Sequence, residues 1–318
     1  LVLPQVPNSR SYNSYTVGHV RYPLPSLVFG AVLQNAAQAR TEGQNLLGRF
    51  QPDGTVWYVP PAGGTDLGST HYAPDANGLT GDVVQSLLDK ALFSGDRALM
   101  NAGLQQLAAM AKFRDSVPRG AQTWEVPLHT PDILASAYLV LAYLRGYHLT
   151  GDPDLLEQAR YWAWTGVPFV YLESPVSGDV GLYATIPVFG ATHWVGSWFG
   201  RPVQWCGLVY AEALHQLAAL DQAGPWQHLA HGIAASGTQQ VWSTADAARQ
   251  GLLPDFYLLQ EQVSDGPAIN PGTLQSQAVQ YYTGERPYSF HAFREHGLLL
   301  HAPGALADVT QSQDTVAF

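Results

Sequence analysis

The chain of 318 residues has few charged side chains, and acidic residues outnumber basic ones. Charged residues make up 13% of it, and 25 acidic residues against 15 basic ones give a net charge of −10. Such a surface repels phosphate backbones and anionic headgroups, so we expect neither nucleic acid nor a membrane as partner. No run of about 18 apolar residues is present, so no transmembrane span is predicted.

Cysteine is almost absent as well. The single Cys206 excludes an intramolecular disulfide. It stands between Trp205 and Gly207 at the start of a predicted helix, and we interpret it as a small buried hydrophobe rather than a nucleophile.

Sequence motifs for metals and nucleotides are also missing. There is no HExxH helix and no CxxC pair, which disfavours the zinc site that His71, His129 and His193 would form together. Neither a Walker loop nor a GxGxxG fingerprint is present. We therefore predict no metal and no cofactor. The chain starts at Leu1 rather than Met, which we interpret as a processed product, and a secreted or periplasmic location is favoured.

Helical hairpins dominate the pattern that remains. The clearest runs from Thr130 to Tyr147, turns at 150–153 and returns through 155–161. Apolar residues recur at spacings of three and four, Asp precedes Pro at the start of the second helix, and Gly ends the first. Further helices are predicted at 81–91, 98–113, 208–220 and 226–240, with weaker candidates at 26–47 and 270–282.

Long irregular segments lead into every second helix. They span 48–80, 115–131, 166–204 and 241–269, whereas the hairpin turns at 94–97, 150–153 and 221–225 are short. Long loops inside a compact domain are usually functional. Because alternate helices are entered in the same way, we expect these loops to gather at one end of the molecule and the short turns at the other.

The hairpin repeat and the phrase Thr-Gly-Asp-Pro-Asp-Leu-Leu-Glu-Gln-Ala at 150–159 resemble the six-hairpin (α/α) toroid enzymes, which include many glycoside hydrolases and several polysaccharide lyases. The resemblance implies a predominantly all-α fold, an (α/α) toroid, with sugar bound in a cleft at the loop end. We divide the chain into an extended N-terminal arm (1–25), a toroid catalytic domain (26–285) and a short β segment (286–318). The last is interpreted as the start of a further β-domain.

Aromatic residues favour a carbohydrate ligand. Sugar C–H faces pack on such rings, while carboxylates and amides bind hydroxyl groups. Tryptophans on the predicted loops are the candidate platforms, whereas Trp162 and Trp164 are assigned to the core. The loop tryptophans are Trp57, Trp124, Trp194, Trp198 and Trp205. We expect an oligo- or polysaccharide as substrate.

Hydrolysis of a glycosidic bond needs two carboxyl groups. Glu125, beside Trp124, is the candidate general acid, and Asp75 is the candidate base or nucleophile. Asp255 and Glu261 are substitutes for either role. Asp132 is interpreted as a helix cap.

A polysaccharide lyase is the alternative reaction, with a His or Tyr base and an Asn, His or Arg that neutralises a uronate. The residues for it are His71, Tyr72, Asn77, Arg119, His129, Tyr183, His193 and Arg201. The low basic count weighs against this reading. A noncatalytic glycan-binding or structural module is the second alternative. Substrate-binding candidates common to these readings are His71, Tyr72, Asn77, Trp124, Tyr183, Trp194, Trp198, Arg201, Trp205, Asp255 and Glu261.

Overall fold

The computed structural model describes residues 16–17, 20–21, 27, 31–113, 116–192, 196–198, 200–269, 272–286 and 288–318. Most of the predicted N-terminal arm falls outside these residues. Helices form most of the regular structure that is described. They are α2 (Val32–Leu47), α3 (Asn77–Ser94), α4 (Arg97–Ala109), α5 (Ile133–Thr150), α6 (Pro153–Gly166), α7 (Gln204–Ala218), α8 (Trp226–Gln240) and α9 (Gly272–Thr283).

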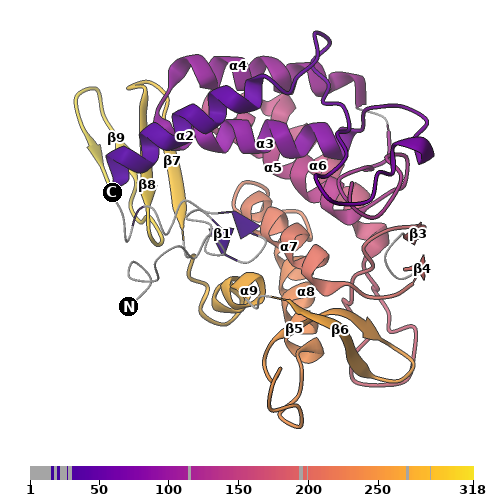
Figure 1. The fold of residues 1–318 in the computed structure, drawn as a ribbon. Helices are drawn as coiled ribbons and strands as arrows, with labels where there is room; N and C mark the ends of the chain where they lie inside the picture. Colours follow the sequence, from indigo (N-terminus) through magenta and orange to yellow (C-terminus); the bar gives the residue numbers. More distant parts are fainter. Residues whose placement is uncertain are drawn as a thin grey trace.

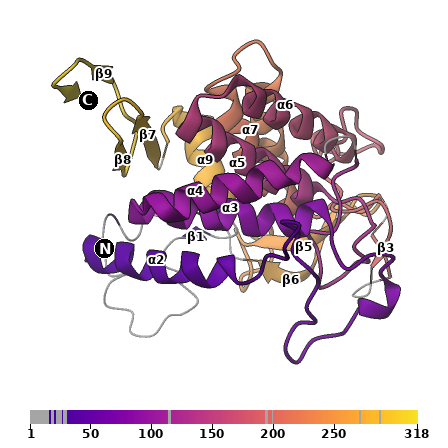
Figure 2. The same cartoon turned by 90° about the horizontal axis from the view of Figure 1, so that it is seen from above.

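The helices form an arc of antiparallel hairpins (Figure 1). Helices α3, α5 and α7 pack side by side, and α4, α6 and α8 pack behind them as the second member of each hairpin. Helix α9 contacts α7 and α8, and α2 lies along α3 and α4, as Figure 2 also shows. The core follows the inner helices, and 12 of the 18 residues of α5 are buried. None of the described helices has the length and apolar character needed to cross a membrane.

Local sequence signals set the hairpin turns. Asp96, Asp132 and Asp152 are N-caps whose carboxylates accept a hydrogen bond from a backbone N–H in the first helical turn. Gly95 and Gly151 end the preceding helices in the left-handed conformation, with φ of 68° and 72°. The predicted capping role of Asp132 is confirmed.

Two helix starts differ from the prediction. Helix α3 begins at Asn77, four residues before the predicted Gly81, because the residues from Asn77 onward are buried against the neighbouring loop. Helix α7 begins at Gln204, which places Trp205 and Cys206 in its first turn. Trp162 is buried as predicted, but the assignment of Trp164 to the core is wrong, since that side chain is 54% exposed.

Five short antiparallel hairpins complete the described fold. The predicted strands of the tail are confirmed as β7 (Ser289–Phe293) and β8 (Leu298–Ala302). Strands β5 (Leu253–Leu258) and β6 (Val263–Ile269) form a hairpin within the segment expected to be a loop. The others have two residues per strand: β1 (Thr16–Val17), β2 (Val20–Arg21), β3 (Ala191–Thr192), β4 (Gly196–Ser197), β9 (Thr310–Gln311) and β10 (Val316–Ala317).

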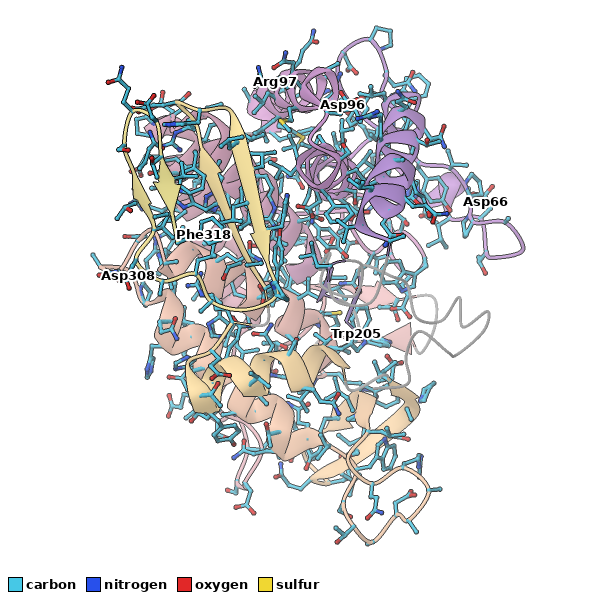
Figure 3. The ribbon with its side chains drawn as sticks, turned by 90° about the vertical axis from the view of Figure 1, so that its left-hand side faces the viewer. Asp66, Asp96, Arg97, Trp205, Asp308 and Phe318 are labelled. Atoms are coloured by element: carbon cyan, nitrogen blue, oxygen red, sulfur yellow. The ribbon has the colours of Figure 1, made fainter. Side chains whose placement is uncertain are left out.

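The two ends of the helix arc differ, as the sequence predicts. The long loops and the β5–β6 hairpin gather at one end, on the right in Figure 1. The short turns lie at the other end, and β7 and β8 stand in front of the helices in Figure 3. There, His301 Nε2 lies 3.2 Å from the carbonyl oxygen of Leu92, and Arg294 donates to the carbonyl oxygen of His148 at 3.2 Å. The long loops, which are distant in sequence, therefore meet at the end of the helix arc opposite to β7 and β8.

Candidate active site

The loop that carries Trp124 and Glu125 is anchored to helix α5. One oxygen of the buried Asp132 carboxylate accepts from the N–H of Ala135 at 2.8 Å, and the other accepts from the N–H of Ala121 at 2.9 Å. Gln122 donates from its side chain to the carbonyl oxygen of Pro187 at 3.0 Å. The cap of α5 therefore also positions the start of the loop, four residues before Glu125.

A pocket of about 200 Å³ opens beside this loop. It is lined by Trp124, Glu125, Trp198, Trp205, Asp255, Pro267 and Ile269. The rings of Trp124 and Trp205 stack with their centroids 6.3 Å apart and an angle of 23° between planes. Trp124 is 44% exposed, so it offers part of an open aromatic face at the pocket. Three loop regions contribute, which confirms that they converge.

Glu125 and Asp255 are the acidic groups of the pocket. Burial, reinforced by the negative charge of Asp255, raises the pKa of Glu125 to about 7. Burial also raises the pKa of Asp255, but the Trp205 indole N–H opposes this by donating to Asp255 Oδ1 at 3.1 Å. The two carboxyl groups therefore differ in environment: Asp255 has a donor that favours its ionised form, and Glu125 is 8% exposed beside that charge.

Cys206 lies under the pocket and is fully buried. Burial raises the pKa of its thiol well above the ordinary value, and the charges of Asp255, Asp132 and Glu125 raise it further. A thiol held protonated in this way is a poor nucleophile. The interpretation of Cys206 as a buried hydrophobe is confirmed.

Asp75, the predicted base, lies elsewhere. Its carboxylate is 3.2 Å from Lys112 Nζ, which is also 3.2 Å from Asp53. Asp75 is absent from the described residues that line the pocket, and Asp255 is the carboxylate whose charge acts on Glu125. The predicted pairing of Asp75 with Glu125 is therefore replaced by that of Asp255 with Glu125. The sequence suggests Asp255 only as a substitute for either role, because it reaches the loop from a β-hairpin that no local pattern predicts.

Three candidates form a separate aromatic cluster. Tyr72 stacks on His129, with centroids 4.2 Å apart, while its own side chain is 88% exposed. His71 Nδ1 accepts from the N–H of Leu128 at 3.2 Å. Burial, then the charge of His129, lowers the pKa of His71. This cluster belongs to the loop end but does not line the pocket.

Other candidates hold the loops together. Asn77 is fully buried, donates to the Val117 carbonyl oxygen at 2.7 Å and accepts from the Arg119 N–H at 2.9 Å, so its assignment to substrate binding is corrected to a structural role. The Arg119 guanidinium donates to two backbone carbonyl oxygens, those of Asp75 and Leu128.

Tyr183 and Glu261 are also absent from the residues that line the pocket. Tyr183 has a φ of 59°, and its hydroxyl lies 2.8 Å from His228 Nε2 on helix α8. Glu261 is exposed in the turn between β5 and β6. The lyase residues named from sequence are therefore spread over different loops and helices.

Trp198, which lines the pocket, and Arg201 both pack against the ring of Phe256. Trp198 is 2% exposed and packs edge-on against Phe256, with centroids 5.9 Å apart. Arg201 places its guanidinium 4.8 Å from the centre of the same ring. His193 and Trp194 lie outside the described residues. Trp57 is 49% exposed and pairs through its backbone with Asp75, in the loop before α3.

Within the described part of the chain, no group of three or more His, Cys, Asp or Glu side chains is placed to hold a metal ion. The absence of a metal and of a cofactor stays a prediction.

Comparison with known proteins gives a likeness of fold. No protein-family model matches the chain, and no curated protein matches it in sequence. An Asp-to-Asn variant of an unsaturated glucuronyl hydrolase with dGlcA-Glc-Rha-Glc aligns with a TM-score of 0.50 at 16% identity, over 79% of this chain and 69% of that one. Cellobiose 2-epimerase from Spirochaeta thermophila aligns at 0.46 and 14% identity, over 80% and 70%. The predicted fold, an (α/α) toroid of helical hairpins with a short β-rich tail, is confirmed.

Proposed function

We propose that the protein is a glycoside hydrolase in which Glu125 is the general acid and Asp255 is its ionised partner. The observation that carries the proposal is the pair itself: two carboxyl groups in one aromatic pocket, with the pKa of Glu125 raised to about 7. An acid with that pKa still carries its proton near neutral pH, whereas an ordinary glutamic acid does not.

The chemistry assigns a separate task to each group. Glu125 donates its proton to the glycosidic oxygen as the bond from that oxygen to the anomeric carbon breaks. Asp255 faces the positive charge that develops on the sugar ring, either by bonding to the anomeric carbon or by removing a proton from the attacking water. In the first case water then breaks the bond between Asp255 and the anomeric carbon, and its proton goes to Glu125. In the second case Asp255 releases the proton to solvent and Glu125 takes one up from solvent. Either way, water supplies the hydroxyl of the new reducing end.

The rest of the pocket supports sugar binding. Trp124 and Trp205 supply stacked aromatic faces on which the C–H face of a sugar packs. The Trp198 indole N–H is buried without a hydrogen-bond partner in the described part of the chain, so a sugar hydroxyl in the pocket would satisfy it. At about 200 Å³ the pocket is smaller than common ligand sites, which favours one sugar ring held inside rather than a length of chain.

The lining favours hydrolysis over elimination. A lyase neutralises the uronate carboxylate before its base removes the neighbouring proton. None of the described residues that line the pocket is Arg, Lys or His, and two are acidic. A uronate carboxylate placed there would meet negative charge instead.

Digestion of a panel of neutral and uronate-containing oligosaccharides tests the proposal. We expect new reducing ends without the ultraviolet absorbance of an unsaturated uronate. Glu125→Gln should remove the activity, and Glu261→Gln, which changes an exposed carboxylate on the β5–β6 turn, is the matched control. If the unsaturated product appears, the reaction is elimination and the assignment of hydrolysis is wrong. Binding of oligosaccharides with no turnover of any would identify a glycan-binding module.

A further inference from the structure

A second cavity, of about 320 Å³, lies at the opposite end of the helix arc from the proposed active site. It is bounded by the C-terminal parts of α5, α7 and α9 and by residues of the tail at 284–286, 288–291 and 305–309, the last marked by Asp308 in Figure 3. None of the residues assigned to glycoside hydrolysis lines it. The proposed function therefore leaves this cavity unexplained.

Basic and imidazole side chains gather around the cavity. Arg145 and Arg286 line it together with three histidines, His148, His215 and His291. Arg286 is exposed, and no ion pair is found for it among the described residues. Its charge is thus available to a ligand.

Arg145 and Glu212, the other charged residues of the cavity wall, have hydrogen-bond partners within the protein, unlike Arg286. Arg145 is paired with Asp89 at 2.5 Å and donates from Nη1 to Gln216 at 2.6 Å, which leaves other N–H groups of its guanidinium for a further acceptor. The negative charge of Glu212 is spread over donors, since Gln216, Gln277 and Gln280 all donate to its carboxylate at 2.8–2.9 Å. Both acidic groups are therefore already satisfied by the protein, whereas Arg286 is not.

The environment of His148, on the cavity wall, is also positively charged. Its pKa is lowered to about 3, first by burial and then by Arg145, His291, Arg294 and Arg286. Three arginine side chains therefore act on one position at the cavity wall. Positive charge at a partly closed site attracts an anion.

His215 supplies an independent sign of a missing ligand. Its side chain lines the cavity and is 3% exposed, yet its Nε2 atom has no hydrogen-bond partner in the described part of the chain. A buried polar atom without a partner costs stability, so such atoms are rare unless something else satisfies them.

We infer that this cavity binds a small organic anion, with Arg286 and Arg145 contacting its charged group and His215 Nε2 hydrogen-bonding it. Its volume lies within the range of common small-molecule sites and suits a sugar-sized molecule that carries a phosphate or a carboxylate. The site is separate from the pocket of Glu125, so it would fill whether or not that pocket is occupied.

Calorimetric titration of the whole chain tests this inference. The probes are inorganic phosphate, glucose 6-phosphate and glucuronate, with glucose as the neutral control and sodium chloride at matched ionic strength. We expect saturable binding of at least one anion and none of glucose at this site. Whether phosphate or glucuronate binds more tightly identifies the charged group that the cavity prefers.

Variants locate the binding. Arg286→Ala changes an exposed side chain, so the variant should fold normally. Its affinity for the anion should fall by about tenfold or more, the loss expected for one charge-assisted hydrogen bond. His215→Phe should weaken it as well. Arg49→Ala, an exposed arginine elsewhere, and Glu125→Gln should leave binding unchanged. The inference is overturned if no anion binds saturably, or if Arg286→Ala binds as tightly as the unchanged protein. Because Glu125→Gln removes hydrolysis and not anion binding, failure of one proposal is distinguishable from failure of the other.

Discussion

Replacement of Glu125 by Gln is the sharpest test of the proposed site, because it keeps the shape of the side chain and removes its proton. With the general acid gone, we expect turnover of a natural glycoside to fall by roughly 10²–10⁴-fold. Substrates whose leaving groups need no protonation should lose much less. The contrast between the two substrates, measured on the same variant, separates loss of the acid from loss of binding.

The pH dependence follows from the pKa of about 7. Glu125 acts in its protonated form. About half of the molecules carry this proton at pH 7 and about a tenth at pH 8. The unchanged protein should therefore lose activity about tenfold per pH unit above pH 8. In Glu125→Gln this limb should disappear from whatever activity remains.

The same substitution changes stability with a definite sign. The pKa of Glu125 is raised from 4.5 in the unfolded chain to about 7 in the folded one, so the folded state binds the proton more tightly. Its ionised form therefore opposes folding, with an effect that is absent below pH 4.5, grows from there to pH 7 and is complete above it. A shift of this size corresponds to roughly 3 kcal/mol. Gln carries no charge and should raise the free energy of unfolding by up to that amount at pH 8.

Two measurements test these expectations. Denaturant titration at pH 4 and pH 8 gives the free energy of unfolding, and kinetics on the two substrates gives the turnover. Glu125→Gln should equal the unchanged protein in stability at pH 4 and exceed it at pH 8, and at both pH values its turnover of the natural glycoside should stay far below that of the unchanged protein. Full activity of the variant, or equal destabilisation at the two pH values, would refute the reasoning that Glu125 is a buried acid with a catalytic proton.

Three further predictions concern the surroundings of Glu125. Asp255→Asn should lower turnover by at least about 100-fold and, because it removes the negative charge that raises the pKa of Glu125, move the alkaline limb of any residual activity to lower pH; an unmoved limb would contradict the coupling. Trp205→Phe keeps a ring but loses the N–H bond to Asp255, so kcat should fall more than KM rises, whereas Trp205→Ala should also raise KM several-fold; steady-state kinetics on one oligosaccharide distinguishes the two. Activity should survive both a chelator and a reductant, since Cys206 is buried and we predict no metal; loss with EDTA that a divalent ion restores would show a metal requirement.

Most of the helical fold could be predicted from the sequence, because its signals are local. Asp before Pro153, Gly151 after a helix and apolar residues at helical spacing each act within a few residues, and the hairpin at 133–166 follows from them. The asymmetry of loop lengths then placed the site at one end. Glu125 can be selected as a candidate in the same way, because an acid beside a tryptophan in a long loop is visible in the sequence, and its side chain does line the pocket.

The sequence does not show that Asp255, rather than Asp75, accompanies Glu125 in the pocket, and the reason is physical. Which two loop carboxylates meet depends on contacts between distant segments, here the β5–β6 hairpin against the loop at 116–131, and neither segment has a periodic pattern. Asp75 looked equivalent by its position before α3, but Lys112, from the end of the next helical hairpin, pairs with it. Long-range pairing of this kind is not encoded in local spacing.

The double hydrogen bonding of Asp132 has a consequence for local unfolding. One carboxylate holds the first turn of α5 and the backbone of Ala121 at the same time, and it is fully buried. Opening of the loop therefore breaks the helix cap, and fraying of the helix releases the loop. The amide hydrogens of Ala121 and Ala135 should exchange with solvent in a single cooperative event, so the position of the loop that carries Glu125 is only as durable as the first turn of the helix behind it.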